Sequence, residues 1–227
     1  MKNIIYFILA AILVSYNFGC QATLKTQTVT VNDSMVLAVE PGDNWQGKIK
    51  VFIFSVKKTP QLAAWVEDDN GNYISSIMAT KRSAQKSWRS APEEGRPEAL
   101  PVWNHRQKNN QRAGELDTIS TATPKGFTEA KIDNDSFVNG NTYNVFLEIN
   151  HSFDYNDTWT ESNSGVNGQP SIIYKAKFTA GIGANTELEP IGHGSVDGSD
   201  GTITSELNNL STALEIIKNA RLIVKKN

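Results

Sequence analysis

The chain has 227 residues, a formal net charge of −2 at pH 7 and a hydrophobic fraction of 39%. This length suits one domain with a substantial core, and the nearly balanced charge, with no long run of one sign, excludes the basic surface of a nucleic-acid-binding protein. The aromatic share of 9% and the recurring apolar segments argue against a disordered chain.

The first residues have the pattern of an export signal. Lys2 precedes an apolar run over residues 4–14, and the small residue Gly19 follows shortly after this run. A charged start, a short apolar run and a small residue before a cleavage point are typical of a signal peptide, and the run is too short to span a bilayer. We expect residues 1–19 to be a signal peptide and the mature protein to work outside the cytoplasm.

Cys20 is the only cysteine in the chain, so a disulfide framework is excluded. Gly19–Cys20 resembles the end of a bacterial lipobox, in which the cysteine is diacylated, and two acyl chains hold a protein stably on a membrane. The sequence therefore predicts a lipid anchor at Cys20 and a tether over 20–25, on the periplasmic side of a bacterial membrane or at the cell surface. Asn17 and Phe18 depart from the usual lipobox, and a cut after Ala22 would instead give a soluble periplasmic or secreted protein.

A single domain is predicted over residues 26–227. Its clearest strand pattern is the segment 48–56, where alternation places Ile49, Val51 and Ile53 on one face. Asn70-Gly71 can supply the positive φ angles of a tight hairpin turn. The strands expected in the first half of the domain are 26–31, 34–39, 48–56, 61–67 and 73–78.

The segment 79–116 contains basic residues, three prolines and two tryptophans, and lacks strand alternation. It is expected to be a long loop excursion at the rim of the strand-rich domain, with one short helix. Strands are expected again at 127–132, 143–149, 171–178 and 221–225.

Residues 207–218 place Leu207, Leu210, Leu214 and Ile217 at helical spacing, which predicts a short C-terminal helix. Seven or more short strands separated by turns then favour a mainly β fold. The predicted architecture is an antiparallel β-sandwich with a long loop excursion and this helix.

Three stretches of the domain resemble one bacterial family. They are Leu62–Asp68 together with Gly71–Tyr73, Leu147–Asn156, and Gly168–Ser171. Over roughly residues 45 to 225 the chain resembles the predicted periplasmic family catalogued as domain of unknown function 2271. The resemblance implies an exported protein of immunoglobulin-like build, often encoded near flavin transferases and membrane electron-transfer proteins. It implies no established activity.

The segment from Asp117 to Thr123 resembles the acceptor motif of proteins that receive FMN covalently through a threonine hydroxyl. Thr123 would be the acceptor, with Asp117 and Ser120 in the motif, and the small residues with the following proline would allow an accessible turn. Thr121 departs from the Gly or Ser usual there. The alternative is an ordinary Asp-, Ser- and Thr-rich turn.

Two loops carry candidate metal ligands. His151, Asp154 and Asp157 follow a predicted strand, and an imidazole with two carboxylates suits a first-row metal better than calcium. The alternative is a loop whose aspartates cap turns. His193 lies between glycines near two further aspartates, a segment that flexible glycines also explain; the spacing is not that of an EF-hand. His151 and His193 could share one site if the two loops meet.

Aromatic residues in predicted loops could form a stacking platform for carbohydrate or for a partner protein. The alternative is that these rings pin the long loops to the sandwich. The candidates are Trp88, Trp103, Tyr155 and Trp159.

No arrangement of nucleophile, acid and base indicates hydrolytic catalysis. The favoured hypothesis is an envelope lipoprotein without catalytic activity or cofactor, which binds or scaffolds a partner protein through the 79–116 excursion, in a flavin-linked electron-transfer system. The alternatives are a redox carrier with FMN on Thr123 and a carbohydrate-binding module.

Overall fold

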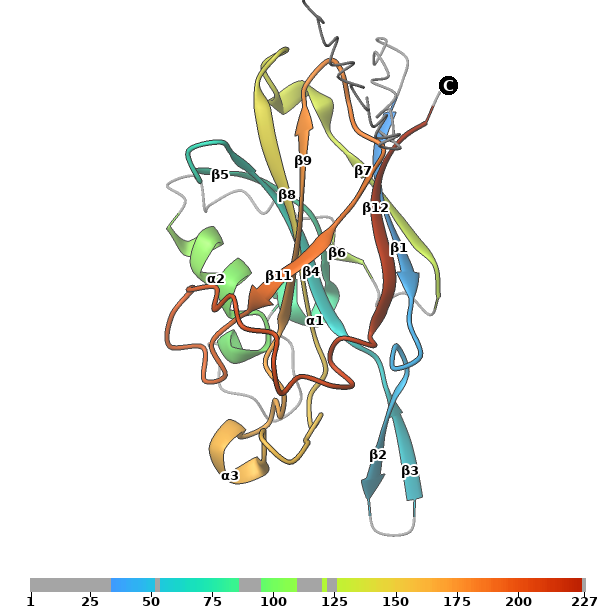
Figure 1. Ribbon diagram of the computed structural model, residues 1–227, viewed down its shortest axis with the longest axis vertical. Helices are drawn as coiled ribbons and strands as arrows, with labels where there is room; N and C mark the ends of the chain where they lie inside the picture. The colour runs from blue at the N-terminus through green and yellow to red at the C-terminus, as the bar shows by residue number, and fades with distance from the viewer. Residues whose placement is uncertain (1–33, 52–53, 86–94, 110–119, 122–125, 226–227) are drawn as a thin grey trace, which may run out of the picture.

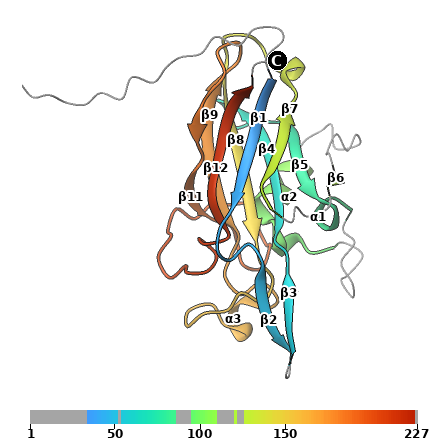
Figure 2. The same ribbon diagram turned by 90° about the vertical axis from the view of Figure 1, so that its right-hand side faces the viewer.

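The computed structural model describes residues 34–51, 54–85, 95–109, 120–121 and 126–225. Two twisted sheets pack face to face (Figures 1 and 2), and a separate two-stranded ribbon extends from one end. Every strand pair is antiparallel except β5 with β6. The predicted mainly β, antiparallel sandwich is confirmed.

The smaller sheet has four strands in the order β10-β12-β1-β7. Its central strands β1 and β12 pair in register from Ser34 opposite Lys225 to Glu40 opposite Asn219, so the first and last strands of the described domain are neighbours. The strands of this sheet are β1 (Ser34–Pro41), β7 (Thr128–Ile132), β10 (Thr186–Glu187) and β12 (Ile217–Lys225).

The larger sheet has six strands in the order β11-β9-β8-β4-β5-β6. The predicted hairpin of β4 and β5 is confirmed, and Gly71 in its turn has φ +82°, an angle that glycine adopts without strain. The strands are β4 (Gln61–Asp68), β5 (Tyr73–Thr80), β6 (Ser120–Thr121), β8 (Thr142–Asn150), β9 (Ile172–Thr179) and β11 (Glu189–His193).

Both faces of the larger sheet are covered. Side chains such as Leu62 and Leu147 point between the sheets into the main core. Alternate residues such as Trp65 and Phe146, whose rings stack 5.2 Å apart, form a second core on the outer face. The excursion after β5 covers that face, which explains why β4 is buried along nearly its whole length. An uninterrupted apolar strand is the expected result of burial on both faces.

The excursion contains more regular structure than the single helix predicted. Pro101 opens its longest helix, where its fixed φ and missing N–H are tolerated. The helical elements of the described chain are α1 (Lys81–Gln85), the 3₁₀ turn η1 (Pro97–Ala99), α2 (Pro101–Lys108), the 3₁₀ turn η2 (Asn134–Ser136) and α3 (Glu161–Ser164).

The segment 48–56 is a hairpin and not the single strand predicted. β2 (Gly47–Val51) and β3 (Phe54–Lys58) pair with Val51 opposite Phe54, and residues 52–53, including Ile53, lie outside the described residues. The sequence between the two strands, Val51-Phe52-Ile53-Phe54, is apolar throughout and contains none of the Gly, Pro, Asn or Asp residues that mark a turn. Periodicity alone therefore could not reveal the reversal.

The helix predicted for 207–218 is not formed, and the prediction was wrong. Residues 208–209 and 212–215 form turns and β12 begins at Ile217, while the predicted strand at 221–225 is confirmed within β12. Asn209 has φ +63°, which no right-handed helix accommodates. The backbone there bonds to tertiary partners: Gln169 accepts from the Ser211 N–H and Asn156 donates to the Asn209 carbonyl. The strand predicted at 26–31 lies outside the described residues.

Candidate functional site

The loops at one end of the sandwich are bonded into one structure, which we call the loop platform: residues 42–46, 95–100, 151–170 and 194–212. In Figure 1 it lies at the lower end, with α3, away from the start of β1. Side chains from each loop bond to another loop, as with His151 to Asn44 and Asn167 to Val196. These cross-links hold the loops as one surface.

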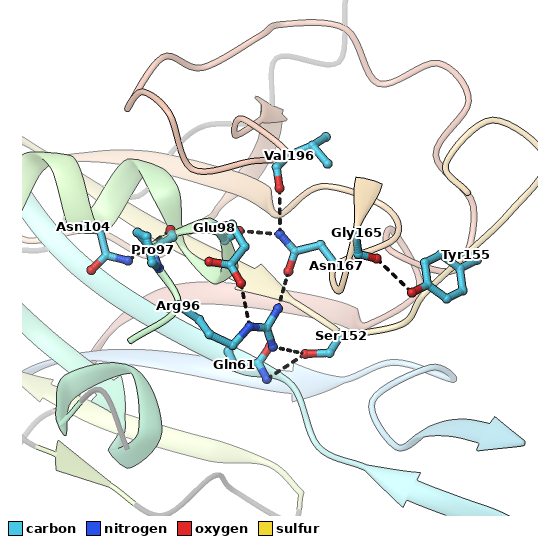
Figure 3. A network of polar contacts seen from close by, with 10 residues as sticks. All are labelled: Gln61, Arg96, Pro97, Glu98, Asn104, Ser152, Tyr155, Gly165, Asn167 and Val196. Carbon is cyan, nitrogen blue, oxygen red and sulfur yellow. Dashed lines mark hydrogen bonds and ion pairs between the residues drawn. The ribbon is translucent and has the colours of Figure 1, made fainter. Parts of the chain in front are cut away.

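Arg96 is the centre of this network (Figure 3). Its Nε bonds Glu98 at 2.7 Å, and its two terminal nitrogens bond the Ser152 hydroxyl at 2.7 Å and the Asn167 side-chain oxygen at 2.8 Å. Only 11% of the side chain is exposed. A buried guanidinium is stable only when its donors are occupied, so Arg96 joins the excursion to the loop after β8.

Two buried amides complete the platform. The Asn167 side-chain nitrogen donates to the carbonyls of Glu98 and Val196, at 2.5 and 3.1 Å. The Gln169 side chain accepts from the Ser211 N–H and donates to the Thr212 hydroxyl, each at 2.7 Å. These groups satisfy loop backbone that would otherwise be buried without partners, so they hold the loops in place.

Glu148 is fully buried at the start of α2. Its carboxylate accepts from the Trp103 N–H at 2.8 Å, the Val102 N–H at 3.2 Å and the Ser171 hydroxyl at 2.6 Å. Burial raises its pKa to about 7 against the opposing effect of these three donors. The first N–H groups of a helix lack partners within the helix, and Glu148 supplies them from the neighbouring sheet. It has no exposed surface and holds α2 on the second core.

His151, the first of the candidate metal ligands, has backbone partners in the 42–46 loop. It is buried, and its Nε2 lies 2.9 Å from the Asn44 carbonyl and 3.2 Å from the Trp45 carbonyl. Because carbonyls only accept, Nε2 carries the proton. Burial, helped by the charge of Lys58, lowers the pKa of His151 to about 4, so the ring is neutral at pH 7. Its place is the junction between the sandwich and the 42–46 loop.

Asp154 also has a partner within the loop platform. Its Oδ1 accepts from the Thr212 hydroxyl at 2.8 Å, and burial raises its pKa. Lys58 donates to the Ser152 carbonyl beside it, and burial lowers the pKa of that lysine. Asp157 is exposed. In the part of the chain that the structure describes, no three residues of the His, Cys, Asp and Glu types are grouped so as to hold a metal ion.

His193 lies apart from this group. Its ring packs edge-on against Trp159, with centroids 6.0 Å apart, and its Nδ1 lies 2.9 Å from the Gly194 carbonyl. The structure thus gives the two histidines different partners. Trp159 is half-buried through this contact.

Trp103 is not available for ligand stacking. Only 1% of it is exposed, and its indole N–H donates to the Ser76 hydroxyl at 2.9 Å. It packs in the second core because α2 lies flat on the sheet. The alternative interpretation, a tryptophan that pins the excursion, is the correct one here. Trp88 lies outside the described residues.

The exposed aromatic rings of the platform are Phe153 and Tyr155, in edge-on contact at 6.4 Å. The Tyr155 hydroxyl donates to the Gly165 carbonyl. Phe153 has φ +58°, an uncommon angle for a bulky residue, and its N–H donates to the Val166 carbonyl at 2.7 Å. The loop therefore fixes a strained backbone and leaves Phe153 44% exposed, beside exposed Val166. This small apolar patch was not predicted from sequence.

Other candidate residues fall where the structure gives little information. Cys20, Asp117 and Thr123 lie outside the described residues, and Ser120 begins β6, beside Ala79 of β5. Sequence reasoning missed Arg96, Asn167 and Glu148. Only Glu148 left a signal, because it is a carboxylate between two apolar strand residues, Leu147 and Ile149.

Comparison of the chain with protein-family models, with curated proteins and with solved structures found no match. The resemblance to domain of unknown function 2271 therefore stays a prediction. Among the described helices, none has the length and apolar character needed to cross a bilayer.

Proposed function

We propose that this protein is an exported, lipid-anchored envelope protein whose domain binds or scaffolds a partner protein without catalysing a reaction. The observation that carries the proposal is the division of roles on the loop platform. Its buried polar side chains are engaged in holding loops together, while its exposed apolar residues gather in one patch. Rigid loops that display aromatic rings are typical of a binding surface.

The position of the platform fits an anchor at Cys20. The domain is entered at Ser34, at the end of β1 away from the platform (Figure 2). Cys20 and Ser34 are fourteen positions apart, which gives a reach of at most about 50 Å. A lipid at Cys20 would leave the platform directed away from the membrane, toward other envelope proteins.

The kind of partner that we propose rests on the family resemblance. A family often encoded near flavin transferases and membrane electron-transfer proteins suggests a partner in a flavin-linked system. This is an association and supplies no mechanism.

The intact mass of the protein purified from its native envelope tests the proposal. We expect the mass of a chain that begins at Cys20 with acyl groups, and we expect Cys20→Ser to release the protein from membranes. A bare chain beginning at Thr23 would overturn the lipid anchor. An added FMN mass that Thr123→Ala removes would replace the binding role with that of a membrane-tethered electron carrier.

A further inference from the structure

The ribbon of β2 and β3 stands apart from the two sheets. Within the described residues, β2 and β3 pair only with each other, and the ribbon extends beyond the sandwich at the platform end in both views. Its base is held to the platform, because Lys58 donates to the Ser152 carbonyl. An isolated two-stranded hairpin is at best marginally stable in water.

The register of the ribbon places like charges together. Lys48 and Lys57 are directly opposite each other, and both are exposed. Directly opposed like charges destabilise a sheet. Neither lysine pairs with a carboxylate of the described residues, where the paired lysines are Lys177, Lys218 and Lys225.

Both outer edges of the ribbon are open. With only two strands in this sheet, each strand has outward N–H and C=O groups that no strand of the described chain pairs. Open edges of this kind accept a further strand from another chain. The register of the ribbon also pairs two apolar positions, Ile49 and Val56.

We propose that the β2–β3 ribbon binds an extended, acidic segment of a partner polypeptide, which adds to the ribbon as a third strand. Backbone pairing supplies the docking, and a carboxylate of the added strand beside Lys48 or Lys57 offsets the repulsion between the two lysines. The inference deepens the proposed function, on which it rests, by naming the chemistry of the partner.

The backbone edges favour a polypeptide over a membrane surface. An anionic bilayer would complement the lysines and the apolar positions equally well, but it offers no strand to the open edges. The ribbon also lies at the end remote from Ser34.

A binding titration with a short synthetic peptide in which Glu and Val alternate tests the inference on the mature protein. We expect the peptide to bind the unmodified protein. Lys48→Gln/Lys57→Gln should weaken binding about fivefold, or about 1 kcal/mol, because the added strand places a carboxylate directly opposite one of the two lysines. The same peptide with every backbone nitrogen methylated should not bind, because neither of its edges then has N–H groups to pair with the ribbon.

Lys81→Gln/Lys131→Gln is the matched control, since it removes two exposed positive charges from α1 and β7. It should leave peptide binding unchanged. Thermal unfolding should show that Lys48→Gln/Lys57→Gln is at least as stable as the unmodified protein, which separates a binding defect from misfolding.

Equal binding by the ribbon variant, or full binding of the methylated peptide, would overturn the inference. So would binding to vesicles of phosphatidylethanolamine and phosphatidylglycerol with no binding to the peptide, which would assign the ribbon to a membrane. None of these results bears on the acyl groups at Cys20, so the anchor of the proposed function is judged separately.

Discussion

Glu148 and His151 should make opposite contributions to the pH dependence of stability. Burial raises the pKa of Glu148 from 4.5 to about 7 in the folded protein. Between these values the folded state holds a proton that the unfolded state has lost, so stability falls as pH rises. The contribution is complete below pH 4.5, and its loss over the window amounts to about 3 kcal/mol.

For His151 the sign is reversed. Burial lowers its pKa from 6.5 to about 4, so over this window the unfolded state binds the proton that the folded state excludes. Stability is complete above pH 6.5 and is lost as pH falls, again by about 3 kcal/mol. The two windows overlap between pH 4.5 and 6.5, and there the two contributions cancel. The stability of the unmodified protein should therefore show little net dependence on pH from these two groups.

Urea unfolding at several pH values across this window separates the two groups. For Glu148→Gln we expect the free energy of unfolding to rise with pH by about 3 kcal/mol, because only the histidine contribution remains. For His151→Gln it should fall with rising pH by about 3 kcal/mol. The double variant should again show little slope. Lost hydrogen bonds will lower each curve as a whole without changing its slope.

A Glu148→Gln curve parallel to that of the unmodified protein would refute this reasoning. It would mean that the α2 N–H groups and the Ser171 hydroxyl keep Glu148 ionised throughout the window. Burial would then not be the dominant influence on its pKa.

Three further predictions concern the platform and the second core. Arg96→Ala should destabilise the protein by about 2–4 kcal/mol in urea unfolding, because it leaves buried acceptors unpaired. Arg221→Ala, which breaks an exposed pair, should cost under about 1 kcal/mol. Equal losses would contradict the role given to Arg96. Trp103→Ala should lower the free energy of unfolding by about 3–5 kcal/mol as a core truncation, and Tyr155→Ala by under about 1 kcal/mol. A Trp103→Ala protein of normal stability that had lost carbohydrate binding would restore the stacking hypothesis. The free energy of unfolding of Phe153→Gly should lie within about 1 kcal/mol of that of the unmodified protein, since glycine accepts a positive φ freely. Phe153→Val should be less stable by about 1–2 kcal/mol because of its branched side chain. Equal stability of the two variants would show that φ at this position is not strained.

Local patterns predicted those elements whose conformation depends on near neighbours. The β4–β5 hairpin was predicted correctly because alternation and Asn-Gly act within a few residues. The pattern at 207–218 misled because helical spacing is a weak preference, and bonds from Gln169 and Asn156 outweigh it. The β2–β3 reversal was missed because no Gly, Pro, Asn or Asp lies between the two strands to mark a turn.

The sequence by itself determined the mainly β class, most strand positions and the expectation of an exported, anchored chain, because these follow from local periodicity and composition. Only the tertiary structure decided that Trp103 lies in a core, that Glu148 meets the start of α2 and that Arg96 joins the platform loops. Arg96 and Ser152 are 56 positions apart, and no local pattern specifies which distant residue a side chain will meet. The packing of the two sheets and the excursion brings them together.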